Sequence, residues 1–145
     1  MKHPVDIAVA RFKKQFSCSQ SVLSSLAPQL GITDEFALKL ASPFGGGFAR
    51  QGHVCGAVTS ALMAIGLKYG TTTPEGKEEI YKIAQEFIHQ FEKKHDSIIC
   101  RQLIGFDIST TEGFQRGKES GIFTTICPSL VKDAVEIASA LIGQS

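Results

Sequence analysis

The stretch HVCGAVTSALMAIGLKY, residues 53–69, decides the fold class of this chain. It is the most apolar segment of the sequence, its only charged residue is Lys68, and Gly70 follows it directly. The apolar part is shorter than the roughly 20 residues that a helix needs to span a bilayer. It therefore predicts a buried, central helix of a soluble protein.

Helical periodicity continues outward from this segment. In residues 78–95, Ile80, Ile83, Phe87 and Phe91 recur at the spacing of one helix face, with charged residues mostly between them. Thr73 and Pro74 predict the start of this helix, as a capping hydroxyl followed by proline in the first turn. Four further helices are predicted at residues 4–15, 19–30 (ending at Gly31), 33–40 (capped by Thr33) and 125–142.

Two segments interrupt the helical pattern. Residues 45–47 are three glycines that form a loop before the central helix, and residues 105–121 predict a long loop because glycine and polar residues dominate them. No segment predicts a strand. The expected fold is an all-α, compact, single-domain bundle of about six helices over residues 1–145.

The composition excludes several classes of function. With 43% hydrophobic residues the chain can form a substantial core, and 15 basic against 14 acidic residues leave no concentrated basic surface for nucleic acid. The first residues lack the apolar segment of a signal peptide. We therefore expect a cytoplasmic protein with no membrane span and no nucleic-acid partner; a homo-oligomer is compatible with the sequence.

The four cysteines, Cys18, Cys55, Cys100 and Cys127, are the candidate functional residues. In a reducing compartment, four cysteines indicate metal binding, redox chemistry or packing rather than structural disulfides. Each lies where a helix or short helical turn is predicted to begin. There the unpaired amides and the positive end of the helix dipole favour the thiolate, which is both the nucleophile and the metal ligand.

The spacing of the cysteines excludes the common short motifs. The intervals are 37, 45 and 27 residues, so the chain has no C-x-x-C of a zinc ribbon or thioredoxin. His53 and Gly56 flank Cys55 and Arg101 follows Cys100, which makes these three residues candidates for contact with a cofactor at the site.

The sequence around the cysteines resembles the C_GCAxxG_C_C family of redox-active proteins. The resemblance rests on CSQSVL at residues 18–23, CGAVTSALM at 55–63, CRQLIG at 100–105, and Cys127 before the last predicted helix, and it covers nearly the whole chain. The family motif Cys-Gly-Ala-x-x-Gly ends in glycine, whereas this chain has Ser60. The resemblance implies a redox role for the four thiols without naming a reaction.

Three functions agree with these features. In the first and favoured one, the four cysteines converge from separate helices to bind an iron–sulfur cluster or another thiophilic metal such as zinc, for electron transfer or sensing. In the second, the thiols cycle between dithiol and disulfide with a partner protein or a small oxidant or reductant. In the third, the chain is a helical interaction module and the cysteines only pack.

Overall fold

A computed structural model describes residues 3–143 of the chain. This part contains eight α-helices, two short 3-10 helices and no strand, which confirms the all-α prediction. The α-helices are α1 (Pro4–Lys13), α2 (Cys18–Leu30), α3 (Asp34–Ala41), α4 (Gly56–Tyr69), α5 (Lys77–His95), α6 (Cys100–Ile104), α7 (Thr111–Ser120) and α8 (Ile122–Ile142). The 3-10 helices are η1 (Ser42–Phe44) and η2 (Pro74–Gly76).

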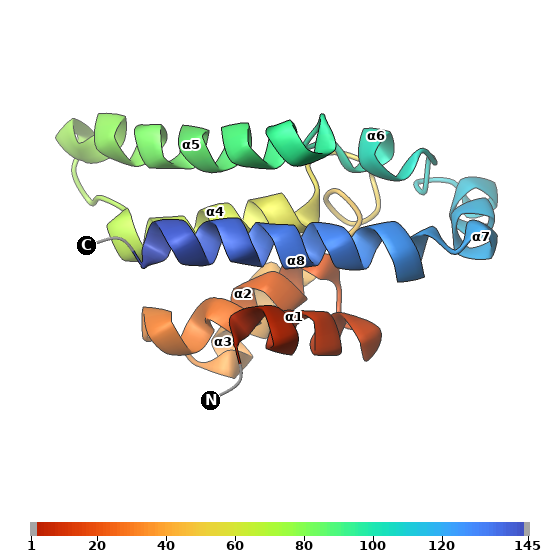
Figure 1. Ribbon diagram of the computed structural model, residues 1–145, viewed down its shortest axis with the longest axis horizontal. Coiled ribbons are helices and arrows are strands. Elements are labelled where there is room, and N and C mark those ends of the chain that lie inside the picture. Colours follow the sequence, from red (N-terminus) through yellow and green to blue (C-terminus); the bar gives the residue numbers. More distant parts are fainter. Residues whose placement is uncertain (1–2, 144–145) are drawn as a thin grey trace.

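Helices α4 and α8 form the middle layer of the molecule. Helix α5 covers them on one side, α1, α2 and α3 lie on the other, and α7 stands at the far end beyond α6 (Figure 1). Helix α4 packs against α2, α5 and α8, so the segment predicted to be central is central. No helix within residues 3–143 has the length and apolar character that crossing a membrane requires.

The buried apolar side chains form two separate clusters. The larger, here called the main core, is built from α2, α4, α5 and α8 and includes Leu23, Leu26, Ile65, Phe87 and Phe91. The smaller, here called the end cluster, has Cys100, Ile104, Ile108 and Ile122 at its centre, with Phe106, Phe114, Phe123 and Cys127 packed against it. The cavity that all four cysteines line lies between these two clusters.

The prediction of a loop over residues 105–121 is wrong for its second half, which forms α7. The Thr110 side chain accepts a hydrogen bond from the Gly113 amide and so caps the helix. Gly117 is buried in the interior of α7, where an added Cβ would lie 3.5 Å from the Phe123 ring. Gly113 and Gly117 therefore belong to a helix and not to a loop. Helix α8 also begins at Ile122, three residues earlier than predicted.

The predicted start of the long amphipathic helix needs a smaller correction. Pro74 opens η2, and α5 follows from Lys77. The Thr73 side chain makes no capping bond; its hydroxyl instead pairs with the Thr71 hydroxyl at 3.1 Å. In contrast, Gly31 ends α2 and Thr33 caps α3, both as predicted.

Candidate functional site

All four cysteines line one cavity between the main core and the end cluster. The cavity has a volume of about 790 Å³, which is within the usual range for sites that bind small molecules or cofactors. Cys18 and Cys55 belong to the main core, whereas Cys100 and Cys127 belong to the end cluster. Residues separated by up to 109 positions are therefore brought to one site.

A short antiparallel pairing of two segments joins Cys55 to Cys100. Val54 and Ile99 form an isolated β-bridge. The Cys55 amide donates to the Ile98 carbonyl at 2.7 Å, and the Cys100 amide donates to the His53 carbonyl at 2.6 Å. Because each cysteine is fixed through its own backbone, the first residue of α6 is held next to the N-cap of α4.

Cys18 lies where the N-termini of α2 and α4 meet. Its sulfur accepts hydrogen bonds from the Cys55 side chain and from the backbone amides of Gly46, Ser19 and Ala57. The hydrogen bond from Cys55 and these three amides outweigh burial and lower the pKa of Cys18 from 9.0 to about 7. About half of the Cys18 side chains are then thiolates at neutral pH.

The pKa of Cys55 is shifted in the opposite direction to that of Cys18. The Cys55 side chain is buried, with 3% exposed, and its thiol donates to the Cys18 sulfur. That hydrogen bond raises the pKa of Cys55 well above its usual value, and burial and the negative charge of Cys18 raise it further. The two residues form an asymmetric pair, a half-buried thiolate and a buried thiol.

Cys100 and Cys127 stay protonated at neutral pH. Burial, followed by the charge of Cys18, raises the pKa of Cys100 to about 11 although the Arg101 charge opposes the shift. Burial and the charges of Cys18 and Cys100 raise the pKa of Cys127 to about 12. The prediction that Cys127 begins a helix is wrong, because α8 starts five residues earlier and Cys127 lies in its second turn. The unpaired amides of that helix start are therefore not adjacent to its sulfur.

The glycine-rich segment before α4 forms a left-handed helical turn. Gly46, Gly47, Phe48, Ala49 and Arg50 are consecutive and all have φ between 52° and 72°. Non-glycine residues pay roughly 1–2 kcal/mol each for this conformation. Five backbone hydrogen bonds hold the turn, among them Arg50 amide to Gly45 carbonyl and His53 amide to Gly47 carbonyl, both 3.0 Å. Strained backbone held in this way is concentrated at functional sites, and here it directs the Gly46 amide at Cys18.

Two glycines allow the close approach of backbone to the cysteines. A Cβ at Gly56 would lie 2.7 Å from the Cys18 sulfur and 2.7 Å from the Phe44 carbonyl oxygen. A Cβ at Gly47 would lie 2.8 Å from the Cys100 Cβ and 2.5 Å from the His53 nitrogen. Gly56 is a candidate from the sequence, and the structure places it against Cys18.

The other two candidates from the sequence do not line the cavity. The His53 ring is exposed and packs edge-on against Phe48, with ring centroids 5.8 Å apart. The Arg101 guanidinium pairs with Asp107 at 3.2 Å on the surface. Their contact with a cofactor stays a prediction.

Ser60, which replaces the last glycine of the family motif, is fully buried in α4. Its hydroxyl oxygen has no hydrogen-bond partner within the described residues. A small side chain is therefore accommodated at this position, at the cost of an unsatisfied polar group.

The sulfurs are not arranged as a ready metal cage. Within residues 3–143, no three side chains of histidine, cysteine, aspartate or glutamate are grouped so that they could hold a metal ion. The four cysteines are free thiols. The sequence does not reveal that Lys13 and Lys118 line the cavity, where Arg50 is the third cation.

These features define a small all-helical protein with a four-cysteine cavity and one activated thiol. Residues 16–141 match the protein-family model described as "Putative redox-active protein (C_GCAxxG_C_C)". The chain belongs to this family, as the resemblance around its cysteines predicted. Neither a curated protein nor a solved structure matches the chain.

Proposed function

We propose that the protein is a thiol–disulfide redox protein in which Cys18 is the nucleophile and Cys55 the resolving cysteine. The observation that carries this proposal is the asymmetric pair: the Cys18 pKa is lowered to about 7, and its hydrogen-bonded neighbour Cys55 holds a proton. Both cysteines line the cavity, but Cys18 is half-buried whereas Cys55 is buried, so a small substrate has readier access to Cys18.

The first step is attack by the Cys18 thiolate on one sulfur of a disulfide substrate. A bond forms between Cys18 and that sulfur, the substrate S–S bond breaks, and the other half leaves as a thiolate that takes a proton. The negative charge on Cys18 is then gone, and with it the hydrogen bond and the repulsion that raise the pKa of Cys55. Cys55 consequently loses its proton more readily after the first step than before it.

In the second step the Cys55 thiolate attacks the Cys18 sulfur. This forms the Cys18–Cys55 disulfide and releases the second half of the substrate as a thiol. Two electrons pass from the protein to the substrate, and the reverse sequence oxidises a dithiol. The amides that stabilise the Cys18 thiolate favour the reduced protein, so its disulfide should be more oxidising than an ordinary structural disulfide.

Peptide mapping under non-reducing conditions tests the proposal. The fully reduced protein receives one equivalent of a small disulfide, and we expect a single Cys18–Cys55 bridge. Cys55→Ser should accumulate the mixed disulfide on Cys18, whereas Cys127→Ser should behave as the unchanged protein. A folded protein that forms no bridge, or bridges a different pair, contradicts the assignment.

A second function, binding of an iron–sulfur cluster or zinc, is supported by the number of cysteines at the cavity. Two thiols suffice for the exchange cycle, yet Cys100 and Cys127 line the same cavity as the first pair. Four cysteine thiolates are the donor set that two-iron clusters, four-iron clusters and structural zinc prefer. The side chains as placed do not group three ligands, so binding would require them to rearrange and lose protons.

Anaerobic purification followed by metal analysis and visible absorption tests this second function. Metal in stoichiometric amount that is lost in Cys100→Ser and Cys127→Ser supports it. A colourless, folded, metal-free protein with four titratable thiols contradicts it and leaves the exchange cycle unaffected.

A further inference from the structure

The walls of the cavity are apolar and aromatic around the sulfurs. Apolar side chains from several elements line it, among them Phe12, Phe16, Ile104, Ile108, Phe114 and Phe123. They come from α1 and the segment after it, from α6 and the segment after it, and from α7 and α8. Phe114 and Phe123 lie with ring centroids 5.6 Å apart. Such a wall suits a ligand with an apolar or aromatic body.

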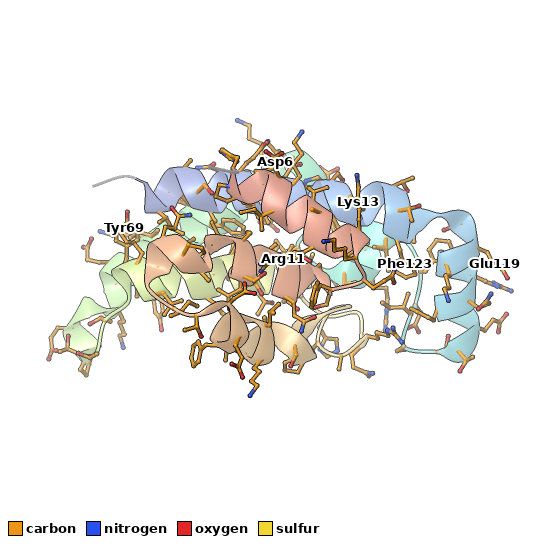
Figure 2. The ribbon with its side chains drawn as sticks, turned by 90° about the horizontal axis from the view of Figure 1, so that it is seen from below. Asp6, Arg11, Lys13, Tyr69, Glu119 and Phe123 are labelled. Carbon is orange, nitrogen blue, oxygen red and sulfur yellow. The ribbon has the colours of Figure 1, made fainter. Side chains whose placement is uncertain are left out.

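The charged residues that line the cavity are all basic. They are Lys13 at the end of α1, Arg50 in the left-handed turn and Lys118 on α7, and no aspartate or glutamate is among the lining residues. Figure 2 shows Lys13 at the end of α1, on the half of the molecule that holds Phe123. Because the whole chain has a net charge of only +1, this is a local concentration and not a consequence of a basic protein.

These three cations lack ion-pair partners within residues 3–143, although seven other ion pairs occur there. Two of them instead share one aromatic ring. The Arg50 guanidinium carbon lies 4.1 Å from the Phe114 ring centroid, and the Lys118 nitrogen lies 5.9 Å from it. The left-handed turn that supplies the Gly46 amide to Cys18 also places Arg50 against this ring.

We infer that the cavity binds a small disulfide, or the corresponding thiol, that has an apolar or aromatic body and carries a carboxylate or another anionic group. The body lies against Phe114, Phe123 and the isoleucines, the anionic group faces Arg50, Lys118 and Lys13, and the disulfide reaches Cys18. This inference rests on the proposed exchange cycle and specifies its substrate. The electrons follow the two steps given above, and both halves of the substrate leave as thiols.

The test compares two aromatic disulfides of similar shape and different charge. Dithiobis(nitrobenzoate) carries a carboxylate on each ring, and dithiodipyridine carries no charge. The rate constant for reaction with reduced protein is measured for both probes by the absorbance of the released thiol. The variants are Arg50→Gln with Lys118→Gln, and the charge reversal Lys118→Glu on the exposed face of α7. Lys77→Gln, at the opposite end of the molecule, is the matched control.

We expect the double variant to react about fivefold more slowly with the anionic probe and within twofold of the unchanged protein with the neutral probe. Lys118→Glu should show the same selectivity, and added salt should slow only the anionic reaction. Lys77→Gln should alter neither rate. Circular dichroism shows whether each variant is folded.

The possible results separate this inference from the function on which it rests. The anionic site is overturned if the folded charge variants react with each probe at the same rate as the unchanged protein. If both reactions are also lost in Cys18→Ser, the exchange cycle still stands. Reactions that persist at full rate in Cys18→Ser overturn the cycle itself, and with it the substrate assignment.

Discussion

Cys18 and Cys100 both occupy the first position of a helix, yet their thiols differ in acidity by about four pKa units. Cys18 begins a 13-residue helix at the edge of the main core and receives three backbone amides and a neighbouring thiol. Cys100 begins a five-residue helix in the end cluster, where burial is the largest influence on its pKa. A helix start therefore lowers the pKa of a thiol only where amides converge on the sulfur and stabilise the thiolate by more than desolvation destabilises it.

The largest effect that this comparison predicts is on alkylation by iodoacetamide at pH 7. The pKa of Cys18 is lowered to about 7 and that of Cys100 is raised to about 11, so the thiolate is far more abundant at Cys18. The lower intrinsic nucleophilicity of an acidic thiolate offsets part of this difference. We expect Cys18 to react about a hundredfold faster than Cys100 or Cys127, as followed by mass spectrometry of the separate peptides.

The pH profile of the same reaction sharpens the result. The Cys18 rate should rise with pH through a midpoint near 7, because its pKa is lowered to about 7 and the thiolate predominates above that value. Cys127→Ser should leave this profile unchanged. Comparable rates for all four cysteines in the folded protein would contradict the distinction between the two clusters.

The next effect concerns the space for an added methyl group at one glycine beside each cluster. Gly56→Ala places a methyl group 2.7 Å from the Cys18 sulfur and from the Phe44 carbonyl, so we expect a loss of about 1–3 kcal/mol in the free energy of unfolding. Gly117→Ala on the end-cluster side meets Phe123 only at 3.5 Å, an ordinary contact, and should gain up to about 1 kcal/mol from helix propensity.

Urea denaturation measures both changes. Gly66→Ala, in the same helix as Gly56 and with nothing within 4 Å of the added carbon, is a second control that should also stabilise. If Gly56→Ala is as stable as Gly66→Ala, the backbone does not approach Cys18 as closely as described.

A smaller effect is expected in the left-handed turn. Ala49 has φ 52°, a conformation that glycine adopts without steric cost, so Ala49→Gly should stabilise the protein by about 0.5–1 kcal/mol. Ala10→Gly, at an exposed position in the right-handed helix α1, should destabilise by about 1 kcal/mol. Thermal denaturation of the two variants would reveal opposite shifts in Tm, and shifts of equal sign would show that the turn is not strained.

The smallest effect is expected for Arg101, the cation next to Cys100. Its ion pair with Asp107 is exposed and screened by solvent, so Arg101→Gln should leave the free energy of unfolding almost unchanged, as should Arg116→Gln in the exposed pair with Glu112. The Cys100 pKa should rise slightly because a nearby positive charge is removed, and the alkylation midpoint of Cys18 should not move. A shift of that midpoint by one unit would place Arg101 in the site.

Particular elements explain how far the sequence could be interpreted. The apolar face and the end of helix α5 follow from the sequence because its apolar positions recur at helical spacing over 19 residues, although the helix starts at Lys77 and not at the predicted Pro74. Helix α7 does not follow from the sequence, because glycines and polar residues dominate it. Its packing face is defined only by the neighbouring side chains of Phe123 and Ile108. The helices of the end cluster are therefore harder to predict from local sequence than those of the main core.

The sequence by itself determined the helical class, most helix boundaries and the four cysteines as the residues of interest, because periodicity and capping are local properties. Only the tertiary structure decided which cysteine is acidic. The pKa of Cys18 depends on amides from α2, from α4 and from the left-handed turn between α3 and α4, and no local pattern specifies that these meet at one sulfur. The same is true of the three cations that line the cavity, since their common charge acts on a ligand only where the fold gathers them.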